Sequence, residues 1–367
     1  MVSERKPIDL LTIRGFRSIQ DQGPLKLGKL NVLIGANGAG KSNFVALFQM
    51  LSELVEGRLQ SWTRHQGSAD RIVSFGVKET PQISATFEFG LNGYHFTLEP
   101  TVDGGFTFAG EWTLFRGRDD KADSLGSGHL EAKLKRLAAK GGNIASHCYK
   151  AIASWKVYHF HDTSETAGVK RLGALHDNDY LRPDASNLAA FLFRIANEQP
   201  GVYEQIRKSV RLAIPFFDDF VLKPQKLATE EEQIRLLWRQ VDSDYPFWPS
   251  QLSDGSIRFI CLVTALLQPN PPTTIIIDEP ELGLHPYALT LLGALIRSAS
   301  ERMQVIVSTQ SVPLVNEFSI DDLLVVERDN NATVFKRHSA DDFASWLEDY
   351  SVGELWEKNV LGGRPPR

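Results

Sequence analysis

Four short apolar runs stand out along this chain, at residues 30–34, 274–277, 305–307 and 323–326. Runs of this length rich in Val, Ile and Leu are typical of strands buried on both faces, as in a parallel sheet. Apolar residues at helical spacing follow the first run through residue 51 and fill 257–267, so helices are predicted there. The pattern predicts an α/β fold.

The long stretch between residues 42 and 252 reads differently. Alternating apolar and polar residues predict two β-hairpins that turn at Asn92-Gly93 and 103–105, with strands at 82–89, 94–99 and 106–112. A polar loop is predicted at 116–128 and a strand at 156–160. Helices are predicted at 130–139, 144–155, 185–197 and 202–212. The third of these is expected to be capped by Asp184, which follows Pro183.

Composition narrows the class of protein. Of the 367 residues 42% are hydrophobic, and 40 basic against 45 acidic residues give a net charge of −5, which does not indicate a nucleic-acid surface. Cys148 and Cys261 form no C-x-x-C pair, as expected in a reducing compartment. The N-terminus lacks a signal-peptide core and no apolar run approaches a membrane span. We expect a cytoplasmic protein with no membrane partner.

The clearest chemistry follows the first apolar run. Residues 35–42, Gly-Ala-Asn-Gly-Ala-Gly-Lys-Ser, match G-x-x-x-x-G-K-[ST] between a predicted strand and a predicted helix. The glycines allow backbone N–H groups to surround a phosphate that the helix start also attracts. Lys41, expected to face solvent, supplies a charge for the β- and γ-phosphates, and Ser42 a hydroxyl ligand for Mg²⁺. The loop predicts binding of a nucleoside triphosphate.

Two acids follow the run at 274–277. A central strand ending in Asp278 and Glu279 would deliver both carboxylates to a phosphate site. Asp278 is predicted to hold Mg²⁺ with Ser42, and Glu279 to activate the attacking water. An ordinary acidic loop after a strand is the alternative, and the phosphate loop in the same chain weakens it.

A third motif, Leu-Ser-Asp-Gly-Ser at 252–256, stands directly before the predicted helix 257–267. It resembles the L-S-G-G-Q signature of ABC-type ATPases, with Asp254 and Ser256 as departures. Ser and Gly at a helix start form a second anion site. In ABC ATPases that site faces the γ-phosphate bound by the other subunit. The resemblance therefore implies a homodimer in which Ser253 and Gly255 contact the partner's nucleotide.

Further segments are similar to the RecF/SMC-like branch of these ATPases, in particular to compact stand-alone AAA-family ATPases related to the ATPase half of the overcoming-lysogenization-defect nucleases. Residues 13–19, IRGFRSI, resemble the opening strand of that branch, and 281–286, ELGLHP, its E-x-x-L-H-P segment at the dimer interface. Residues 35–43 resemble its G-x-N-G-x-G-K-S-N loop. The resemblance implies a nucleotide-binding set of Asn37, Gly38, Ala39, Gly40, Lys41, Ser42 and Asn43.

Residues 305–311 match the strand and S-T-H-S switch of that branch, with Gln310 where His is usual. The switch residue contacts the γ-phosphate and helps to orient the attacking water, so the implied catalytic set is Glu279, Gln310 and Lys41. Gln forms hydrogen bonds but carries no proton or charge. Two interpretations of Gln310 stay open: a neutral γ-phosphate sensor with slow hydrolysis, or simple subfamily variation with little kinetic effect.

One further position is predicted near the nucleotide. ABC ATPases deliver a Gln close to Mg²⁺ from a strand at about the place of 156–160, and His161 or Asp162 is predicted to take that role. A metal site formed by His159, His161 and Asp162 is one alternative, because alternate strand residues share a face. Plain surface polarity is the other.

The resemblance implies an ABC-type ATPase head with a mixed sheet around the phosphate loop, a β-hairpin flap and an inserted helical lobe. No heptad pattern persists, so no coiled coil is expected. The predicted division is an N-terminal ATPase lobe at 1–116, the inserted helical lobe at 117–250 and a C-terminal ATPase lobe at 251–367. The closing residues 346–358 predict a helix packed on the head, or else a docking surface, before a mobile tail at 362–367.

The implied function is Mg²⁺-dependent ATP hydrolysis by an ATP-sandwiched, head-to-tail dimer. Relatives of this type use such closure as a switch for a separately encoded effector, often a nuclease, in bacterial anti-phage defence. A RecF-like repair ATPase that binds DNA is the alternative, with small basic faces at 133–140 and 207–211 as its contacts. A transporter ATPase is the weaker third reading.

Overall fold

The computed structural model describes residues 6–117, 120–226 and 231–363. Internal contacts divide the chain into two compact units, which we describe separately. The first comprises residues 1–157, 272–276 and 303–367, and the second 158–271 and 277–302. The three-part division predicted from the sequence stays a prediction.

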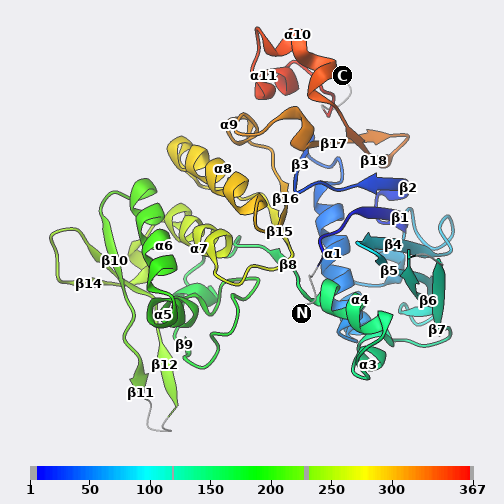
Figure 1. Cartoon of the computed structure of the whole chain (residues 1–367), viewed down its shortest axis with the longest axis horizontal. Coiled ribbons are helices and arrows are strands. Elements are labelled where there is room, and N and C mark those ends of the chain that lie inside the picture. Colours follow the sequence, from blue (N-terminus) through cyan, green and yellow to red (C-terminus); the bar gives the residue numbers. More distant parts are fainter. Residues whose placement is uncertain (1–5, 118–119, 227–230, 364–367) are drawn as a thin grey trace. The chain divides into compact units, whose positions relative to one another are not determined.

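A six-stranded sheet carries the phosphate loop, in the order β18-β17-β3-β16-β15-β8 (Figure 1). The four apolar runs are confirmed as its buried strands: β3 (Leu30–Ile34), β15 (Thr274–Asp278), β16 (Gln304–Ser308) and β17 (Leu323–Asp329). β16 and β17 both run parallel to β3, whereas β18 (Ala332–Arg337) is antiparallel to β17. β8 (Trp155–Tyr158) confirms the strand predicted at 156–160.

A second sheet of the first unit has the order β2-β1-β4-β5-β6-β7 and is antiparallel throughout. Its strands are β1 (Leu10–Phe16), β2 (Ile19–Lys26), β4 (Ile83–Phe89), β5 (Asn92–Pro100), β6 (Phe106–Phe115) and β7 (Lys121–Gly126). This sheet confirms the predicted flap. The first turn lies at Gly90-Leu91 rather than at Asn92-Gly93, because Asn92 already pairs with Phe89.

The polar loop predicted at 116–128 was wrong where it covers β7. The first four residues of that strand are exposed, since an edge strand has no neighbour on its outer side and needs no apolar alternation. Residues 118–119 of the predicted loop, and 364–367 of the predicted tail, lie outside the described residues.

One hydrophobic core joins both sheets of the first unit to its helices. α1 (Lys41–Val55) presents Phe44 and Phe48 to this core, and the Phe48 ring meets those of Phe87 and Trp155 edge-on. The remaining helices around it are α2 (Leu59–His65), α3 (Leu134–Ala138) and α4 (Ile144–Ala153). The helices predicted at 130–139 and 144–155 are thus confirmed, the first as a single turn.

A buried carboxylate ties α3 to the flap. Glu111 of β6 is fully buried, yet both oxygens accept hydrogen bonds. Oε1 accepts from the Tyr94 hydroxyl at 2.8 Å and the Leu134 N–H at 3.1 Å. Oε2 accepts from His129 Nε2 and the Lys133 N–H, both at 2.9 Å. The carboxylate therefore fixes the start of a helix too short to be stable alone.

Replacing Glu111 by Gln should destabilise the protein markedly. The amide NH₂ would face donors that now meet an oxygen, so the expected loss is about 2–4 kcal/mol in the free energy of unfolding. Urea unfolding measures this loss, and Glu99→Gln at an exposed position of the same sheet is the matched control. Equal stability of the two variants would contradict the anchoring role.

The second unit is mainly helical. α5 (Leu188–Glu198), α6 (Pro200–Ala213), α7 (Asp254–Leu267) and α8 (Pro286–Ser300) pack in sequence order and confirm the helices predicted at 185–197, 202–212 and 257–267. Asp184 does not cap α5, because Asn187 occupies the cap position and the Asp184 carboxylate accepts from the Ser186 N–H. Two small sheets absent from the prediction complete the unit. Their strands are β10 (Phe217–Val221), β13 (Leu237–Gln240) and β14 (Pro246–Phe247), and β11 (Gln225–Lys226), β12 (Glu232–Ile234) and β9 (Gly173–Ala174).

The closing segment belongs to the first unit and forms two short helices rather than one. α10 (Ala344–Leu347) exposes Trp346 and Leu347, whereas α11 (Val352–Glu357) buries Leu355 and Trp356. α11 packs against α9 (Val312–Val315). The break arises at Ser351, which caps α11 with its side chain and so starts a new helix.

Candidate nucleotide-binding site

The phosphate loop joins β3 to α1 as predicted. Gly38 and Gly40 have φ values of 76° and 118°, which L-residues with a side chain rarely adopt. At Gly40 a Cβ atom would also collide with the Thr333 side chain. These two glycines are therefore required by the backbone path of the loop. Asn37, Gly38 and Ser42 are exposed, while Ala39 and Gly40 are buried against the body of the unit.

Lys41 does not face solvent, contrary to the prediction. Its side chain is only 5% exposed. Nζ donates to the carbonyl oxygens of Gly35 at 2.7 Å and Ala36 at 3.1 Å. The side chain folds back over its own loop because the loop carbonyls satisfy an ammonium group that burial would otherwise leave without partners. The positive charge is thus held against the first two residues of the loop.

A relay of side-chain hydrogen bonds fixes the far side of the loop. Asn43 Nδ2 donates to Ser18 Oγ at 2.6 Å, Ser18 pairs with Thr333 Oγ1 at 2.7 Å, and Thr333 donates to the Ala39 carbonyl at 2.7 Å. The β1–β2 turn and β18 therefore hold the loop from two sides. No sequence motif pointed to Thr333, which lies far from the loop along the chain.

Arg17 lies in the segment 13–19 that resembles the opening strand of the branch, but no role was predicted for it. It sits at the tip of the β1–β2 turn with φ 49°, a conformation that costs energy for a residue with a side chain. Its guanidinium donates to Gln66 Oε1 at 2.6 Å and Asn43 Oδ1 at 3.5 Å. Burial lowers its pKa, although an arginine stays charged. Arg17 thus places a fixed cation beside the last residue of the phosphate-loop motif.

The switch segment lies beside the same loop. The Thr309 N–H donates to the Leu33 carbonyl at 3.0 Å, which places it next to the end of β3. The Ser311 N–H donates to Thr309 Oγ1 at 3.0 Å, and Ser311 caps α9. Gln310 between them is half-buried. The first unit therefore carries both the phosphate loop and the switch.

Asp278 ends β15 and Glu279 follows it, and β16 lies between that strand and β3 in the sheet. Asp278 and Glu279 are both half-buried. Glu279 has φ 44°, and strained non-glycine residues of this kind gather at functional sites. In the second unit His161 Nε2 donates to the Asp278 backbone carbonyl at 3.0 Å. The residue predicted to act near Mg²⁺ is thus held beside the predicted Mg²⁺ ligand.

The signature motif caps α7. Ser253 Oγ accepts from the Ser256 N–H at 3.1 Å, and Ser253 itself is exposed. Gly255 has a different reason for being glycine, since a Cβ there would collide with the Gly283 carbonyl of the same unit. The start of α7 therefore packs directly on the E-x-x-L-H-P segment. In that segment His285 accepts from the Tyr287 N–H at the start of α8.

Arg258, which sequence reasoning missed, links three parts of the second unit. Its side chain is nearly buried, at 8% exposure. The guanidinium donates to the carbonyls of Phe160 at 2.9 Å and His161 at 3.3 Å, and to that of Leu282. Burial lowers the Arg258 pKa. The signature helix, the His161 segment and the E-x-x-L-H-P segment are thereby held as one body. The available signal was a single Arg inside an otherwise apolar helix.

Among the described residues no group of three or more His, Cys, Asp or Glu side chains could hold a metal ion. His159, His161 and Asp162 are among these described residues and form no such group, so the metal alternative at this segment is wrong. Within the same residues, no helix is long and apolar enough to cross a membrane.

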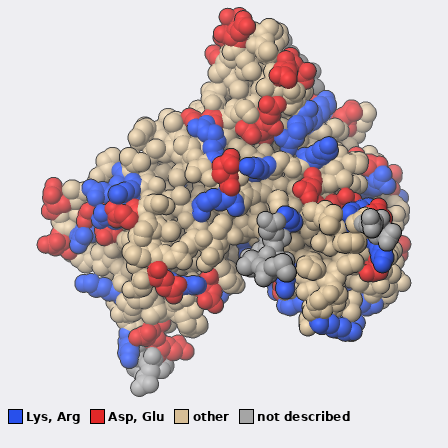
Figure 2. Space-filling model, in the orientation of Figure 1, with Lys and Arg blue, Asp and Glu red and all other residues tan. Residues whose placement is uncertain are grey.

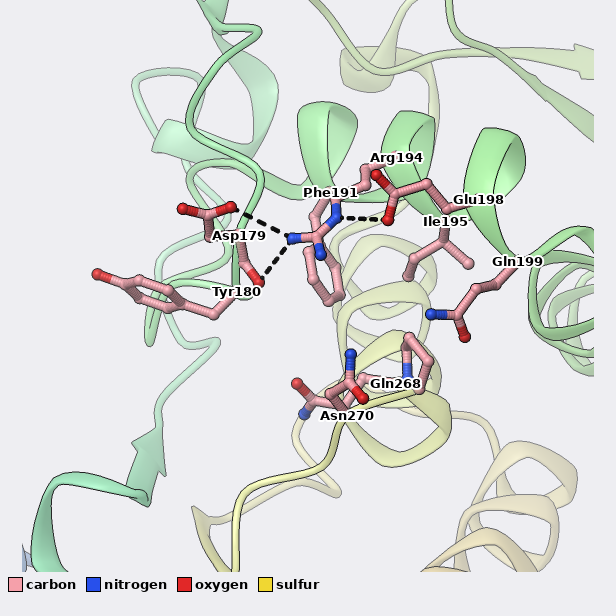
Figure 3. A pocket seen from close by; sticks show the side chains of 10 residues that line it. Asp179, Tyr180, Phe191, Arg194, Ile195, Glu198, Gln199, Gln268 and Asn270 are labelled. Atoms are coloured by element: carbon pink, nitrogen blue, oxygen red, sulfur yellow. Dashed lines mark hydrogen bonds and ion pairs between the residues drawn. The ribbon is translucent and has the colours of Figure 1, made fainter. Parts of the chain in front are cut away.

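A small pocket of the second unit lies between α5 and the end of α7 (Figure 3). Arg194 projects into it and is held by Glu198 at 2.9 Å and by Asp179 at 3.4 Å. Its volume of about 30 Å³ accommodates a water molecule rather than a nucleotide. The pocket therefore serves the packing of α5.

Comparison with known families agrees with this geometry. The family model described as "AAA domain, putative AbiEii toxin, Type IV TA system" matches residues 30–316, which include the phosphate loop, the signature, the two acids and the switch. This chain belongs to that family. AAA domains bind and hydrolyse ATP, so the chain is an ATPase of AAA type. No curated protein matches it.

Comparison with solved structures shows that this AAA-family chain has the fold of SMC head domains. A crystal structure of an Smc head bound to the C-winged helix domain of ScpA is 12% identical, with a TM-score of 0.57, over 92% of this chain and 99% of that one. An Smc head with an extended coiled coil from Pyrococcus furiosus, bound to the C-terminal domain of ScpA, is 13% identical, with a TM-score of 0.54, over 93% and 98%. The predicted fold of an SMC-like ATPase head is confirmed.

Proposed function

We propose that this AAA-family chain is a Mg²⁺-dependent ATPase in which Ser42 and Asp278 hold the metal ion and Glu279 activates water. The observation that carries the proposal is the braced phosphate loop, in which Lys41 is bonded to the Gly35 carbonyl and the Asn43–Ser18–Thr333 relay is bonded to the Ala39 carbonyl. Residues 37–43 take the triphosphate. Mg²⁺ held by Ser42 and Asp278 would neutralise the negative charge that develops on the phosphates.

Glu279 and Gln310 take the catalytic roles in this proposal. Glu279, in its strained conformation, accepts a proton from the attacking water. Gln310 donates a hydrogen bond to the γ-phosphate from the start of the segment that leads into α9. His161, fixed on the Asp278 carbonyl, orients the Mg²⁺ side of the site. The role of His161 rests on this contact and on the resemblance to ABC ATPases.

We further propose that two subunits close head to tail around two nucleotides, with Ser253 and Gly255 of one facing the γ-phosphate of the other. Three features support this arrangement. Ser253 caps α7 yet stays exposed, Leu282 and Tyr287 beside it are exposed apolar residues at 39% and 54%, and Arg258 holds the signature and E-x-x-L-H-P segments together. An exposed helix start in the same unit as exposed apolar residues suits an interface.

A pair of variants at Ser253, one charged and one neutral, tests the shared site. Ser253→Asp keeps an N-cap but sets a carboxylate against the γ-phosphate of the partner subunit, so it should abolish turnover while the variant still binds ATP. Ser253→Asn caps equally well without charge and is the matched control. Steady-state phosphate release and ATP titration separate the two effects. Full activity of Ser253→Asp would contradict the proposed interface.

Mixing Ser253→Asp with Lys41→Ala then decides whether the sites are shared. A mixed dimer places both lesions in one composite site and leaves the other intact. When the subunits exchange at random in an equal mixture, half of the dimers are mixed and each has one intact site. About a quarter of all sites should then be active. If turnover never returns although subunits exchange, each subunit works alone.

The biological role we propose is a switch for a separately encoded effector, such as a nuclease, in bacterial anti-phage defence. The family description, which names a toxin of a type IV toxin–antitoxin system, supports this setting. Its test is co-purification from the native operon, comparing wild type with Glu279→Gln. Equal binding of the effector to wild type and to Glu279→Gln would contradict the proposed switch.

The two basic faces give little support to the alternative of a DNA-binding repair ATPase, because several of their cations are paired with acidic residues. Lys135 pairs with Glu56 at 2.6 Å, Arg207 with Glu204 at 2.9 Å, and Arg211 with Asp218 at 3.6 Å. On the face in Figure 2, basic and acidic residues are interspersed on each unit. Salt-dependent DNA affinity that appears only with ATP would favour the repair reading nevertheless.

A further inference from the structure

The last described residues of the chain return to the phosphate loop. We call residues 352–363, α11 and the segment after it, the C-terminal strap. At its end the Gly363 carbonyl accepts a hydrogen bond from the Ala36 N–H at 2.7 Å. The Gly363 N–H donates to Glu327 Oε1 of β17 at 2.8 Å. The Leu361 carbonyl pairs with His338 Nε2 at 3.0 Å. The strap is thus bonded to the second residue of the phosphate loop.

The other end of the strap holds the helix that follows the switch. The Gly353 N–H donates to Asn316 Oδ1 at 2.7 Å, at the end of α9. Gly353 lies so close to α9 that a Cβ atom would approach Asn316 Oδ1 to 2.6 Å and Val312 Cγ1 to 2.7 Å. Leu355 is fully buried and Leu361 nearly so. These contacts seat α11 on α9, directly after Gln310 and Ser311.

We propose that the C-terminal strap couples the phosphate loop to the switch, so that ATP binding and docking of the strap reinforce each other. This inference rests on the proposed ATP site. The physical link at the loop is Ala36, whose carbonyl accepts from Lys41 Nζ while its N–H donates to Gly363. When Lys41 turns to a triphosphate, the strap remains to hold Ala36 in place. A docked strap therefore preorganises the loop and raises its affinity.

Linkage makes the effect reciprocal. If docking of the strap strengthens ATP binding by some factor, ATP must strengthen docking by the same factor. The bound γ-phosphate acts on the strap from both ends, through the loop at Ala36 and through Gln310 ahead of α9. A purely structural strap would instead contribute to stability and leave the affinity for ATP unchanged.

Gly353→Leu tests the coupling without touching the phosphate loop. The larger side chain cannot fit against Val312 and Asn316, so it should lift α11 from α9 and weaken ATP binding about fivefold or more. Trp346→Ala, at an exposed position of α10 outside the strap, is the control and should bind as wild type. Isothermal titration with a non-hydrolysable ATP analogue and Mg²⁺ measures both.

Hydrogen exchange of the wild-type chain gives a second test that depends on no variant. The analogue should slow exchange of the Gly353, Leu355 and Gly363 amides by the factor seen in the titration. Protection of the phosphate-loop amides with no change in the strap, or a Gly353→Leu protein that undocks α11 yet binds ATP normally, would overturn the coupling. No binding and no protection of the loop would instead overturn the proposed ATP site.

Discussion

Glu279→Gln should bind ATP and Mg²⁺ but hydrolyse the nucleotide on the order of a hundred to ten thousand times more slowly than wild type. Gln keeps the size and hydrogen-bonding capacity of Glu but cannot accept a proton from the attacking water. Both residues have the same backbone preferences, so the strain at φ 44° stays constant. The loss would therefore report on the carboxylate and not on the fold.

The same variant should accumulate as a closed dimer, because ATP binds and is not consumed. Size-exclusion chromatography with ATP and Mg²⁺, run beside a phosphate-release assay, tests both effects. Asp278→Asn is the informative comparison, since loss of a metal ligand should also weaken Mg²⁺-dependent binding. Wild-type turnover by Glu279→Gln would place the base elsewhere, with Glu281 and His161 the next candidates.

The elements that carry the nucleotide chemistry follow from the sequence because local signals specify them. Strands buried on both faces must be apolar runs, and the glycines of the loop are required by φ values of 76° and 118°. Asp278 and Ser253 fall at the ends of such elements, β15 and α7. Their positions along the chain therefore sufficed to predict where each would lie in the fold.

Elements without a local signal were missed. β7 has no apolar alternation, and β9, β11 and β14 have only two residues each, too few for any period to appear. These short strands pair because the surrounding chain brings them together, and no local propensity specifies them.

The functional contacts that the sequence hid are tertiary. Thr333 lies far along the chain from the Ala39 carbonyl that it meets, and Arg258 satisfies three carbonyls from two other segments. Gly255 looked like an anion-binding glycine, but packing against Gly283 already requires it. This contact changes the choice of test, because a bulky residue at 255 would disturb its own subunit, whereas Asp or Asn at exposed Ser253 keeps the cap of α7.

Lys41→Ala should remove ATP binding, with a loss of at least about a hundredfold in affinity, because the ammonium group would supply the positive charge that binds the β- and γ-phosphates. Its burial changes the expected cost. The side chain is 5% exposed and donates to two loop carbonyls, so the variant should also melt a few degrees lower.

Lys41→Met separates these contributions, since it keeps most of the buried aliphatic stem and removes only the charge and its hydrogen bonds. Lys29→Ala, which deletes an exposed lysine just before β3, controls for net charge and should bind ATP as wild type does. Calorimetric titration of all three variants, after a cooperative melt has shown that each is folded, is the measurement. A folded Lys41→Met protein with wild-type ATP affinity would mean that the cation is supplied by another residue, and Arg17 beside Asn43 is then the first to replace.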